Sequence, residues 1–143
     1  MVRINIINPR YLTDQHLVAE YNEILMLFGY VRKHSHTHFN QVPKSYRLGQ
    51  GHILFFKNKL KYLEIRFETI KKEMRRRGFC GTKNIDFKGI DKNLINDWKP
   101  LGLDKEIIKN RLIEKINLKP DYYRYYGEYK TKKFFVNMIK NAK

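Results

Sequence analysis

Apolar side chains recur every three or four residues in several stretches of the chain, a spacing typical of an α-helix with one buried face. The first stretch runs from about residue 14 to the histidine-rich segment that begins at His34. Thr13 or Asp14 can cap its start, because either side chain can accept a hydrogen bond from an unpaired backbone N–H. The sequence therefore predicts a first helix whose buried stripe consists of Leu17, Tyr21, Ile24, Phe28 and Val31.

The other side of this predicted helix is mainly polar. With about 100° of rotation per residue, Gln15, Asn22 and Met26 fall opposite the apolar stripe. His16 and Glu23 lie next to each other at the edge of the polar side. A carboxylate is therefore expected on a well-anchored helix, about two turns from its start.

A second stretch predicts a helix over residues 52–77, ended by Gly78. Its other surfaces are expected to be strongly basic, and some of the cations are expected to meet phosphates. The predicted stripe consists of Leu54, Leu60 or Lys61, Leu63, Phe67, Ile70 and Met74. The cations are Lys57, Lys59, Lys61, Arg66, Lys71, Lys72, Arg75, Arg76 and Arg77.

A third helix is predicted from Asp104, which can cap its start, to about residue 117. On this helix Arg111 and Lys115 share a face, because they are four residues apart. A short extra helix is predicted within residues 131–143. The inner face of the third helix consists of Ile107, Ile108, Leu112 and Ile116, and that of the extra helix of Phe134, Phe135, Met138 and Ile139.

The remaining segments are predicted to be irregular. Residues 2–12 are expected to form an extended N-terminal arm, since Pro9 disfavours helix before it. Glycines and a proline interrupt residues 80–103, where Trp98 is expected to pin the connection to the core. The sequence thus predicts an all-α, compact single domain of three main helices over residues 1–143, with residues 128–143 as an extension.

The charge of the chain points to a polyanionic partner. Thirty basic residues against fourteen acidic ones give a net charge of +16, and nucleic acid is the most plausible partner for such a field. An anionic membrane surface is the competing explanation, but no apolar run is long enough to span a bilayer and no secretion signal is present. The single cysteine, Cys80, fits a reducing compartment. We expect an intracellular, cytoplasmic protein with access to DNA.

Two motifs and one further histidine could suggest a metal, cofactor or catalytic site, but the surrounding residues argue against each of them. His34, His36 and His38 diverge on a helix and have no cysteine or carboxylate nearby, so a basic loop facing DNA is favoured over a metal site. Gly49-Gln50-Gly51 lacks the third glycine and the preceding strand of a dinucleotide fingerprint. His52 is interpreted as a satisfied core or cap residue rather than a catalytic one. No metal and no nucleotide cofactor are expected.

An aromatic segment near the end of the chain, residues 119–126, contains four tyrosines and Arg124. Such interleaving suits DNA contact, because rings can stack on exposed bases while cations hold phosphates. The alternative is that Tyr123 and Tyr126 pack in the core and only their neighbours are exposed.

Several short blocks along the chain carry a family resemblance. They begin with Arg3-Ile4-Asn5, Asp14-Gln15-His16-Leu17, Ala19-Glu20-Tyr21, Glu23, Phe28-Gly29 and Val31-Arg32-Lys33-His34. They continue with Leu48-Gly49, Gly51-His52, Phe55-Phe56, Lys59-Leu60, Leu63, Arg66 and Arg77-Gly78-Phe79. They end with Arg111-Leu112, Glu114-Lys115-Ile116, Pro120, Tyr123 and Tyr125-Tyr126-Gly127. In order and spacing these blocks resemble the phage-type pyrimidine-dimer DNA glycosylases, which also cleave abasic sites.

The resemblance implies a DNA repair enzyme with two activities. In the family, the α-amino group of the second residue, exposed when Met1 is removed, attacks C1′ of the damaged nucleotide and forms an imine that permits strand cleavage by β-elimination. Here that residue is Val2, and Glu23 matches the essential carboxylate of the family. The implied partner is duplex DNA containing a lesion, bound by a monomer without a cofactor.

The candidate DNA-binding residues come from the resemblance, from the polar side of the first helix and from the aromatic segment. The chain departs from the family at Asn22 and Met26, where arginines are common, and at Tyr122, where the family has a tryptophan. Cleavage chemistry is therefore a safer expectation than dimer specificity. The candidates are Arg3, Gln15, His16, Asn22, Met26, Arg32, Lys33, Arg111, Lys115, Tyr122, Tyr123 and Arg124.

Two alternatives stay open. One is a glycosylase and lyase for a different damaged or modified base, suggested by Asn22 and Met26. The other is a non-catalytic, basic protein that binds duplex DNA, which the charge alone supports equally well. A substitution of Glu23 by glutamine separates them, since only an enzyme has cleavage to lose.

Overall fold

The computed structural model describes residues 4–34 and 42–143. Its elements are η1 Pro9–Tyr11, α1 Asp14–Lys33, α2 His52–Phe56, α3 Leu60–Arg76, η3 Lys92–Leu94, α4 Gly102–Leu118, β1 Arg124–Tyr125, β2 Glu128–Tyr129 and α5 Lys132–Lys140. Helices dominate and the two short strands form a single antiparallel pair, so the predicted all-α class is confirmed. None of the helices within the described ranges is long and apolar enough to cross a membrane.

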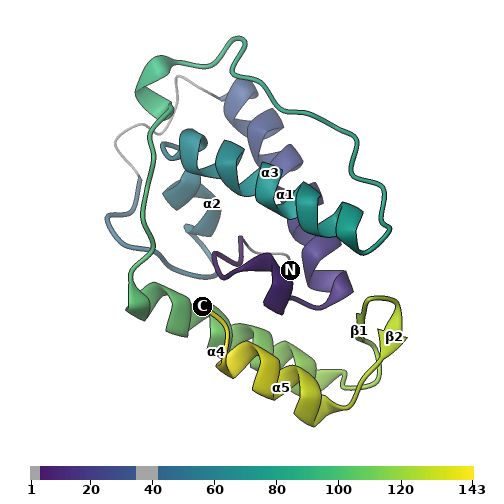
Figure 1. The fold of residues 1–143 in the computed structure, drawn as a ribbon. Coiled ribbons are helices and arrows are strands. Elements are labelled where there is room, and N and C mark those ends of the chain that lie inside the picture. The colour runs from purple at the N-terminus through teal and green to yellow at the C-terminus, as the bar shows by residue number, and fades with distance from the viewer. Residues whose placement is uncertain (1–3, 35–41) are drawn as a thin grey trace.

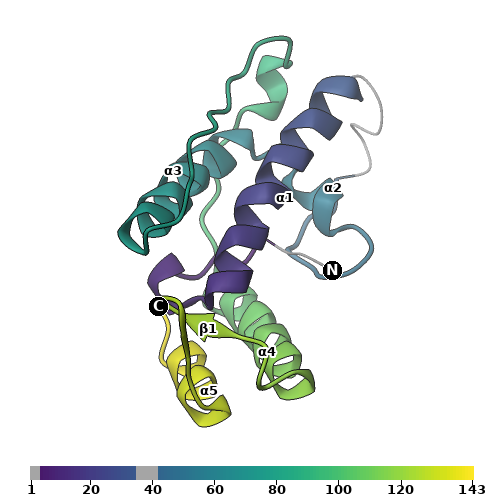
Figure 2. The ribbon, with the colours of Figure 1, turned by 90° about the vertical axis from the view of Figure 1, so that its right-hand side faces the viewer.

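The helices lie in two groups with the N-terminal arm between them (Figure 1). In one group α1 packs against α3, with the short α2 beside them, and in the other α4 packs against α5. The second view shows α4 and α5 near the N-terminal end of α1 (Figure 2). The start of α1 therefore lies where the two groups and the β-hairpin meet.

The first helix agrees with its prediction. α1 spans Asp14–Lys33, and the hydroxyl of Thr13 caps it by accepting a hydrogen bond from the N–H of His16 at 3.1 Å. Asp14 is therefore not the cap. The predicted stripe of Leu17, Tyr21, Ile24, Phe28 and Val31 is buried in full.

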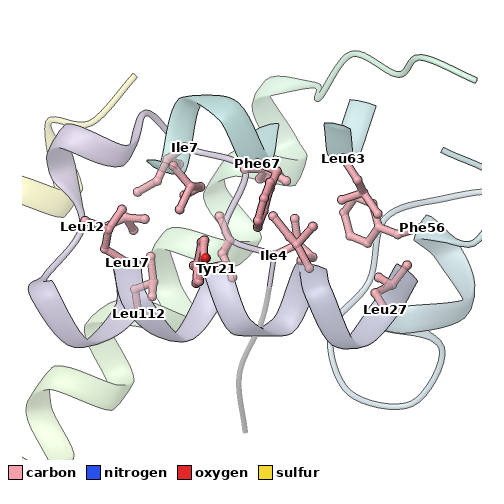
Figure 3. Close-up of a cluster of buried hydrophobic side chains, with 14 of the residues drawn as sticks. Ile4, Ile7, Leu12, Leu17, Tyr21, Leu27, Phe56, Leu63, Phe67 and Leu112 are labelled. Carbon is pink, nitrogen blue, oxygen red and sulfur yellow. The ribbon is translucent and has the colours of Figure 1, made fainter. Parts of the chain in front are cut away.

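The N-terminal arm is part of the hydrophobic core. Ile4, Ile7 and Leu12 are fully buried and lie among side chains from α1, α3 and α4 (Figure 3). Labelled neighbours in that view are Leu17, Tyr21, Phe67 and Leu112. Because its apolar side chains fill the space between helices, the arm has a fixed course through the protein.

The predicted helix over residues 52–77 is wrong in one respect, because it is divided between α2 and α3. At the break, the Nζ of Lys59 donates a hydrogen bond to the carbonyl of Phe55 at 2.7 Å. The first turn of α3 is then capped from the loop, since the N–H groups of Lys61 and Tyr62 both donate to the carbonyl of Asn96. A tertiary partner thus replaces helical hydrogen bonds that a continuous helix would have formed.

The prediction that all nine cations of this stretch lie on its surface is also wrong. Lys57, Arg66, Lys71 and Arg77 are buried. The ammonium of Lys57 donates to the carbonyl of His34, and that of Lys71 to the side chain of Asn84. Buried cations must be paired or hydrogen bonded to be tolerated, so these four hold elements together rather than forming a solvated basic face.

Three predicted features of the connections are confirmed. Gly78 ends α3 with a φ of 82°, in the left-handed region that glycine adopts without strain. Residues 80–101 contain only the short η3 Lys92–Leu94, and α4 begins at Gly102, two residues before the predicted end of the connection. Trp98 fastens this connection to the core through ring contacts with Tyr46, Phe55 and Phe56 at centroid distances of 6.1, 5.1 and 5.6 Å.

The C-terminal part differs from its prediction at two points. α4 begins at Gly102 rather than at Asp104, whose carboxylate accepts a hydrogen bond from the N–H of Leu101 at 2.9 Å. The hairpin of β1 and β2 was not predicted, and its turn has positive φ at Tyr126 and Gly127, as a tight two-residue hairpin turn requires.

The extra helix predicted within residues 131–143 is present as α5 Lys132–Lys140. Phe135 and Ile139 are fully buried, whereas Phe134 is partly exposed. The end of the chain returns to the arm, because the carbonyl of Lys143 accepts a hydrogen bond from the N–H of Asn8 at 2.9 Å.

Candidate active site and nucleic-acid interface

Four buried or nearly buried side chains hold the backbone of the N-terminal arm, and we call them the arm clamp: Glu20, Tyr46, His52 and Arg66. The Nε2 of His52 accepts a hydrogen bond from the N–H of Ile4 at 3.0 Å, and the hydroxyl of Tyr46 donates to the carbonyl of Ile4 at 3.3 Å. The clamp therefore fixes both polar groups of one backbone residue.

The interpretation of His52 as a satisfied core residue is supported by its geometry. Its Nδ1 lies 2.8 Å from the carbonyl oxygen of Arg47. A carbonyl can only accept, so Nδ1 carries the proton and Nε2 is free to accept from Ile4. Both ring nitrogens are used, and the ring is 1% exposed.

The other half of the clamp is a buried ion pair between α1 and α3. Glu20 is 0% exposed and accepts hydrogen bonds from Arg66 at 2.6 and 3.0 Å and from the N–H of Asn5 at 3.0 Å. The guanidinium of Arg66 also donates to the carbonyl of Ile7. Burial alone lowers the pKa of Arg66, but the Glu20 carboxylate raises it overall, so the guanidinium stays charged.

Sequence reasoning missed the clamp, although a signal was present. Glu20 lies three residues after Leu17 and four before Ile24, inside the apolar stripe of α1, and Arg66 lies in the same relation to Leu63 and Ile70 on α3. A charged residue within a buried stripe requires a partner of opposite charge on a helix that packs against it.

A cavity of about 330 Å³ lies between the start of α1, α4 and the aromatic segment, and we call it the α1–α4 cavity. It is lined by Asn5, Gln15, His16, Ala19, Ile108, Arg111, Leu112, Lys115, Leu118, Lys119, Tyr122 and Tyr123. Six candidate DNA-binding residues thus meet around one space: Gln15, His16, Arg111, Lys115, Tyr122 and Tyr123.

The imidazole of His16 is held against one wall of this cavity. Its Nδ1 lies 3.0 Å from the hydroxyl oxygen of Thr13, and its ring packs against Tyr123 at a centroid distance of 4.8 Å. Burial and the positive charge of Lys115 lower the pKa of His16 from 6.5 to about 4. His16 is therefore neutral at physiological pH.

A second hollow of about 440 Å³ lies on the other side of Gln15 and Tyr122, between α1 and the hairpin. Asn22 and Arg124 line it, together with Phe79, which is not among the candidate DNA-binding residues named from the sequence. The amide of Gln15 separates the two spaces, because it donates to the carbonyl of Tyr122 at 3.1 Å and accepts from the N–H of Arg124 at 2.9 Å.

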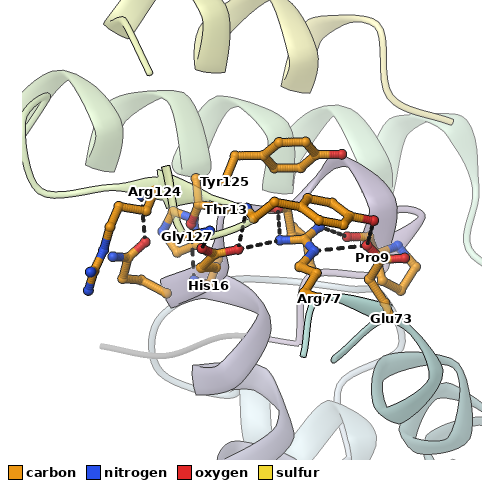
Figure 4. Close-up of polar contacts among 12 residues, drawn as sticks. Pro9, Thr13, His16, Glu73, Arg77, Arg124, Tyr125 and Gly127 are labelled. Carbon is orange, nitrogen blue, oxygen red and sulfur yellow. Dashed lines mark hydrogen bonds and ion pairs between the residues drawn. The ribbon is translucent and has the colours of Figure 1, made fainter. Parts of the chain in front are cut away.

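The hairpin of β1 and β2, where the aromatic segment ends, is held against α1 and α3 by a buried ionic network (Figure 4). The carboxylate of Asp14 accepts from the N–H groups of Tyr126 and Gly127 at 3.0 and 2.7 Å, and it pairs with Arg77 at 3.0 Å. Arg77 also pairs with Glu73 at 2.8 Å. Arg77 and Asp14 thus position the segment that was predicted to contact DNA.

Only one of the two tyrosines expected in the core under the alternative interpretation is there. Tyr123 is 6% exposed, whereas Tyr126 is 41% exposed and its hydroxyl donates to Glu73 at 3.0 Å. Tyr122 is 56% exposed and lines both spaces.

The remaining candidates are more scattered. Glu23 is half-buried on α1, one turn beyond Ala19, and Met26 is 68% exposed. Arg32 and Lys33 are exposed at the far end of α1, where Arg32 donates to the carbonyl of Asp86 at 3.0 Å. The structure does not bring these two cations to the α1–α4 cavity.

Some candidates lie outside the described residues. They are Val2, Arg3, His36 and His38. Within residues 4–34 and 42–143, no group of three or more histidine, cysteine, aspartate or glutamate side chains could hold a metal ion.

The chain matches a known protein family over more than half of its length. The model of the family described as pyrimidine dimer DNA glycosylase matches residues 1–87, which include the arm, α1, α2 and α3. This range contains Val2, His16, Glu23 and the whole arm clamp. The match covers more than half of the chain, and the chain therefore belongs to the pyrimidine dimer DNA glycosylase family.

Proposed function

We propose that this protein excises pyrimidine dimers from ultraviolet-damaged duplex DNA by N-glycosylase action and then cleaves the resulting abasic site by β-elimination. The nucleophile in this proposal is the α-amine of Val2, exposed when Met1 is removed, and Glu23 is the catalytic carboxylate. The observation that carries the proposal is the arm clamp, which fixes Ile4 through His52 and holds Asn5 against the helix that bears Glu23.

The clamp limits where the amine can go. Val2 precedes Ile4 by two residues, and two residues of chain span at most about 7 Å. A nucleophile on a tether this short needs little ordering when substrate binds, which is the entropic benefit of a positioned reactive group.

The α-amine also has a suitable pKa. An unperturbed α-amino group titrates at about 7.7–8.0 and a lysine at about 10.4, so roughly a tenth of the amine is neutral and nucleophilic at pH 7, against less than about a thousandth of a lysine. The net charge of +16 disfavours the protonated form further, because like charges repel.

The proposed reaction has two stages. The amine nitrogen forms a bond to C1′ while the glycosidic C1′–N bond breaks, and the electron pair leaves with the base, which takes up a proton. The sugar ring then opens as nitrogen and C1′ form an imine. Loss of a proton from C2′ expels the 3′ phosphate by cleavage of the C3′–O bond. Glu23 stabilises the positive charge on the sugar and moves these protons.

The α1–α4 cavity and the adjoining hollow supply the proposed DNA contacts. Arg111 and Lys115 offer charge to phosphates, and Tyr122 offers a ring to an unstacked base. An enzyme that acts on a damaged base extrudes a nucleotide, and this costs less where pairing is already weak. The chemistry needs only an amine and a carboxylate, so we propose a monomer without a cofactor.

Borohydride trapping tests this proposal directly. Purified protein confirmed to begin at Val2 is incubated with three duplexes: undamaged, abasic, and containing a cyclobutane pyrimidine dimer. We expect a covalent adduct at the α-amine of Val2 with the last two duplexes. No adduct on either duplex would leave a non-catalytic, basic DNA-binding protein.

The Glu23→Gln variant is the matched control. It keeps the shape of the side chain and removes the carboxylate, so we expect retained DNA binding and lost cleavage. Loss of binding as well would point to a role in folding or DNA contact rather than catalysis.

A second candidate, a glycosylase for another modified base, is favoured by Asn22 and Met26. Both lie on the exposed side of α1 where arginines are common in the family, and Asn22 lines the hollow beside Tyr122. Trapping on abasic DNA without activity on the dimer would favour this candidate.

A further inference from the structure

We propose that Thr13 fixes the tautomer of His16, so that His16 is a neutral donor that gives a hydrogen bond from Nε2 to an oxygen atom of DNA bound in the α1–α4 cavity. The identity of the ligand rests on the proposed function, whereas the tautomer rests on the protein alone. Thr13 is a positioning residue in this proposal, and His16 makes the contact.

Among the described residues, the hydroxyl of Thr13 has two hydrogen-bond partners, and both belong to His16. Its oxygen accepts from the backbone N–H of His16 at 3.1 Å and lies 3.0 Å from the ring Nδ1. Thr13 is 0% exposed, so its hydroxyl proton cannot go to bulk water. In the part of the chain that the structure describes, Nδ1 is the only acceptor within reach of that proton.

The direction of this hydrogen bond follows from satisfying every polar group. A proton on Nδ1 would point at a hydroxyl whose own proton then had no acceptor, and a buried unsatisfied donor costs about 1–3 kcal/mol. Thr13 therefore donates and Nδ1 accepts, which places the ring proton on Nε2.

His52 has the opposite tautomer from the one proposed for His16. Nδ1 of His52 faces the carbonyl of Arg47, which can only accept, so that ring is protonated on Nδ1 and accepts at Nε2. The two residues carry the same side chain, and the difference between their tautomers comes entirely from the partner of Nδ1.

The ring of His16 is held in place and remains neutral. It packs against Tyr123, which in turn contacts Phe135 of α5 at a centroid distance of 6.5 Å. The polar side chains that share the cavity wall with it are Asn5 from the arm, Gln15 from α1, Arg111, Lys115 and Lys119 from α4 and its end, and Tyr122 and Tyr123 from the aromatic segment. Burial opposes protonation of the ring, and the positive charge of Lys115 does the same.

Nε2 has no hydrogen-bond partner among the residues in the two described ranges, and the side chain lines the cavity with Arg111 and Lys115. A neutral donor beside two cations suits an oxygen of a phosphate or a sugar. The same tautomer cannot take a proton at Nε2, so the proton transfers of the proposed reaction fall to Glu23.

Long-range ¹H–¹⁵N NMR of the full chain measures the tautomer directly. We expect the His16 pattern of a protonated Nε2 and an unprotonated Nδ1, unchanged between pH 5 and 8, with His52 showing the opposite pattern. A protonated Nδ1 in His16 overturns the proposal.

Substitutions at Thr13 test the cause. Thr13→Ser keeps the hydroxyl and should keep the tautomer. Thr13→Asp keeps a helix cap but can only accept from the ring, so it should move the proton to Nδ1 and raise the pKa of His16. An unchanged tautomer in a folded Thr13→Asp variant contradicts the role of Thr13. If that variant does not fold, the wild-type and Thr13→Ser spectra test the proposal, because both should show His16 protonated on Nε2.

DNA binding tests the role of the donor. With a duplex containing a tetrahydrofuran abasic analogue, we expect His16→Met to weaken binding by about tenfold or more and His16→Gln, which retains an N–H donor, to recover most of the loss. The ratio of wild-type to His16→Met affinity should be constant from pH 5 to 8. Equal losses in both variants, or a ratio that follows a titration near pH 6.5, refutes the donor role. Absence of cleavage by the wild type would refute the proposed function and leave the NMR result standing.

Discussion

The arm clamp and the α1–α4 cavity both use side chains of α1, but they differ in how far their polar groups are hydrogen bonded within the protein. In the clamp, Glu20 is fully buried against Arg66, and both ring nitrogens of His52 are hydrogen bonded. In the cavity, Nε2 of His16 and the ammonium of Lys115 have no hydrogen-bond or ion-pair partner among the described residues.

This difference separates groups that stabilise the fold from groups that are ready to bind. A fully satisfied buried pair is costly to break, because removing one partner leaves an uncompensated charge. Donors that face a cavity contribute little to folding, but they need no rearrangement when an anion arrives. The clamp therefore fixes the arm, and the cavity remains available for DNA.

The largest expected effect comes from breaking the ion pair of the clamp. Glu20→Gln leaves Arg66 buried and unpaired, and we expect the free energy of unfolding to fall by about 3–5 kcal/mol in urea denaturation. Glu64→Gln is the matched control, because Glu64 pairs with the exposed Lys61 and its loss should cost about 0–1 kcal/mol. Equal losses in the two variants would mean that the buried Glu20–Arg66 pair contributes no more to stability than the exposed Glu64–Lys61 pair.

Removing the imidazole of the clamp is expected to have the next largest effect. His52→Ala leaves the N–H of Ile4 and the carbonyl of Arg47 without partners, which should cost about 2–4 kcal/mol of unfolding free energy. If the arm positions the nucleophile, trapping on abasic DNA should also slow by about tenfold to a hundredfold. A destabilised variant that traps at the wild-type rate, assayed where it remains folded, would separate the clamp from catalysis.

The pH dependence of stability should reveal the buried ring of the cavity. The pKa of His16 is about 4 in the folded state and 6.5 in the reference state. Between these values the unfolded chain binds more protons, so the free energy of unfolding falls as pH falls from 6.5 towards 4. Because the residue keeps part of its surface exposed where it lines the cavity, we expect a loss of about 1–2 kcal/mol, less than the full shift implies. His16→Gln should lack this component, and identical pH profiles would contradict the lowered pKa.

The smallest effect on stability is expected for the cavity cation. Lys115→Gln should change the free energy of unfolding by less than about 0.5 kcal/mol, because Lys115 has no partner to lose within the described chain. Its effect should appear instead in DNA binding, as a salt dependence reduced by about one phosphate contact. Lys72→Gln, an exposed site on α3 outside the cavity, is the control. Equal changes in salt dependence would mean that the cavity is not the phosphate site.

Periodic features could be predicted from the sequence. The stripe of α1 from Leu17 to Val31, the glycine that ends α3 and the short helix α5 all depend on neighbours within one or two turns. The sequence also identifies Gln15, His16, Arg111 and Lys115 as candidates, and in the structure these residues line one cavity.

Features with distant partners could not be predicted in this way. The break between α2 and α3 depends on a carbonyl of Asn96, far along the chain. The buried state of Arg77 depends on Asp14, and the hairpin depends on the same carboxylate. In each case a polar group is satisfied by a residue whose proximity no local pattern reveals.

The sequence by itself determined the amphipathic stretches that become helices, the net positive charge and the residues that resemble the glycosylase family, because each can be read from the residues without knowledge of the fold. Only the tertiary structure decided which cations are buried and how the arm is held. These depend on hydrogen-bond partners up to tens of residues away, since a buried polar group takes whatever partner the fold brings to it.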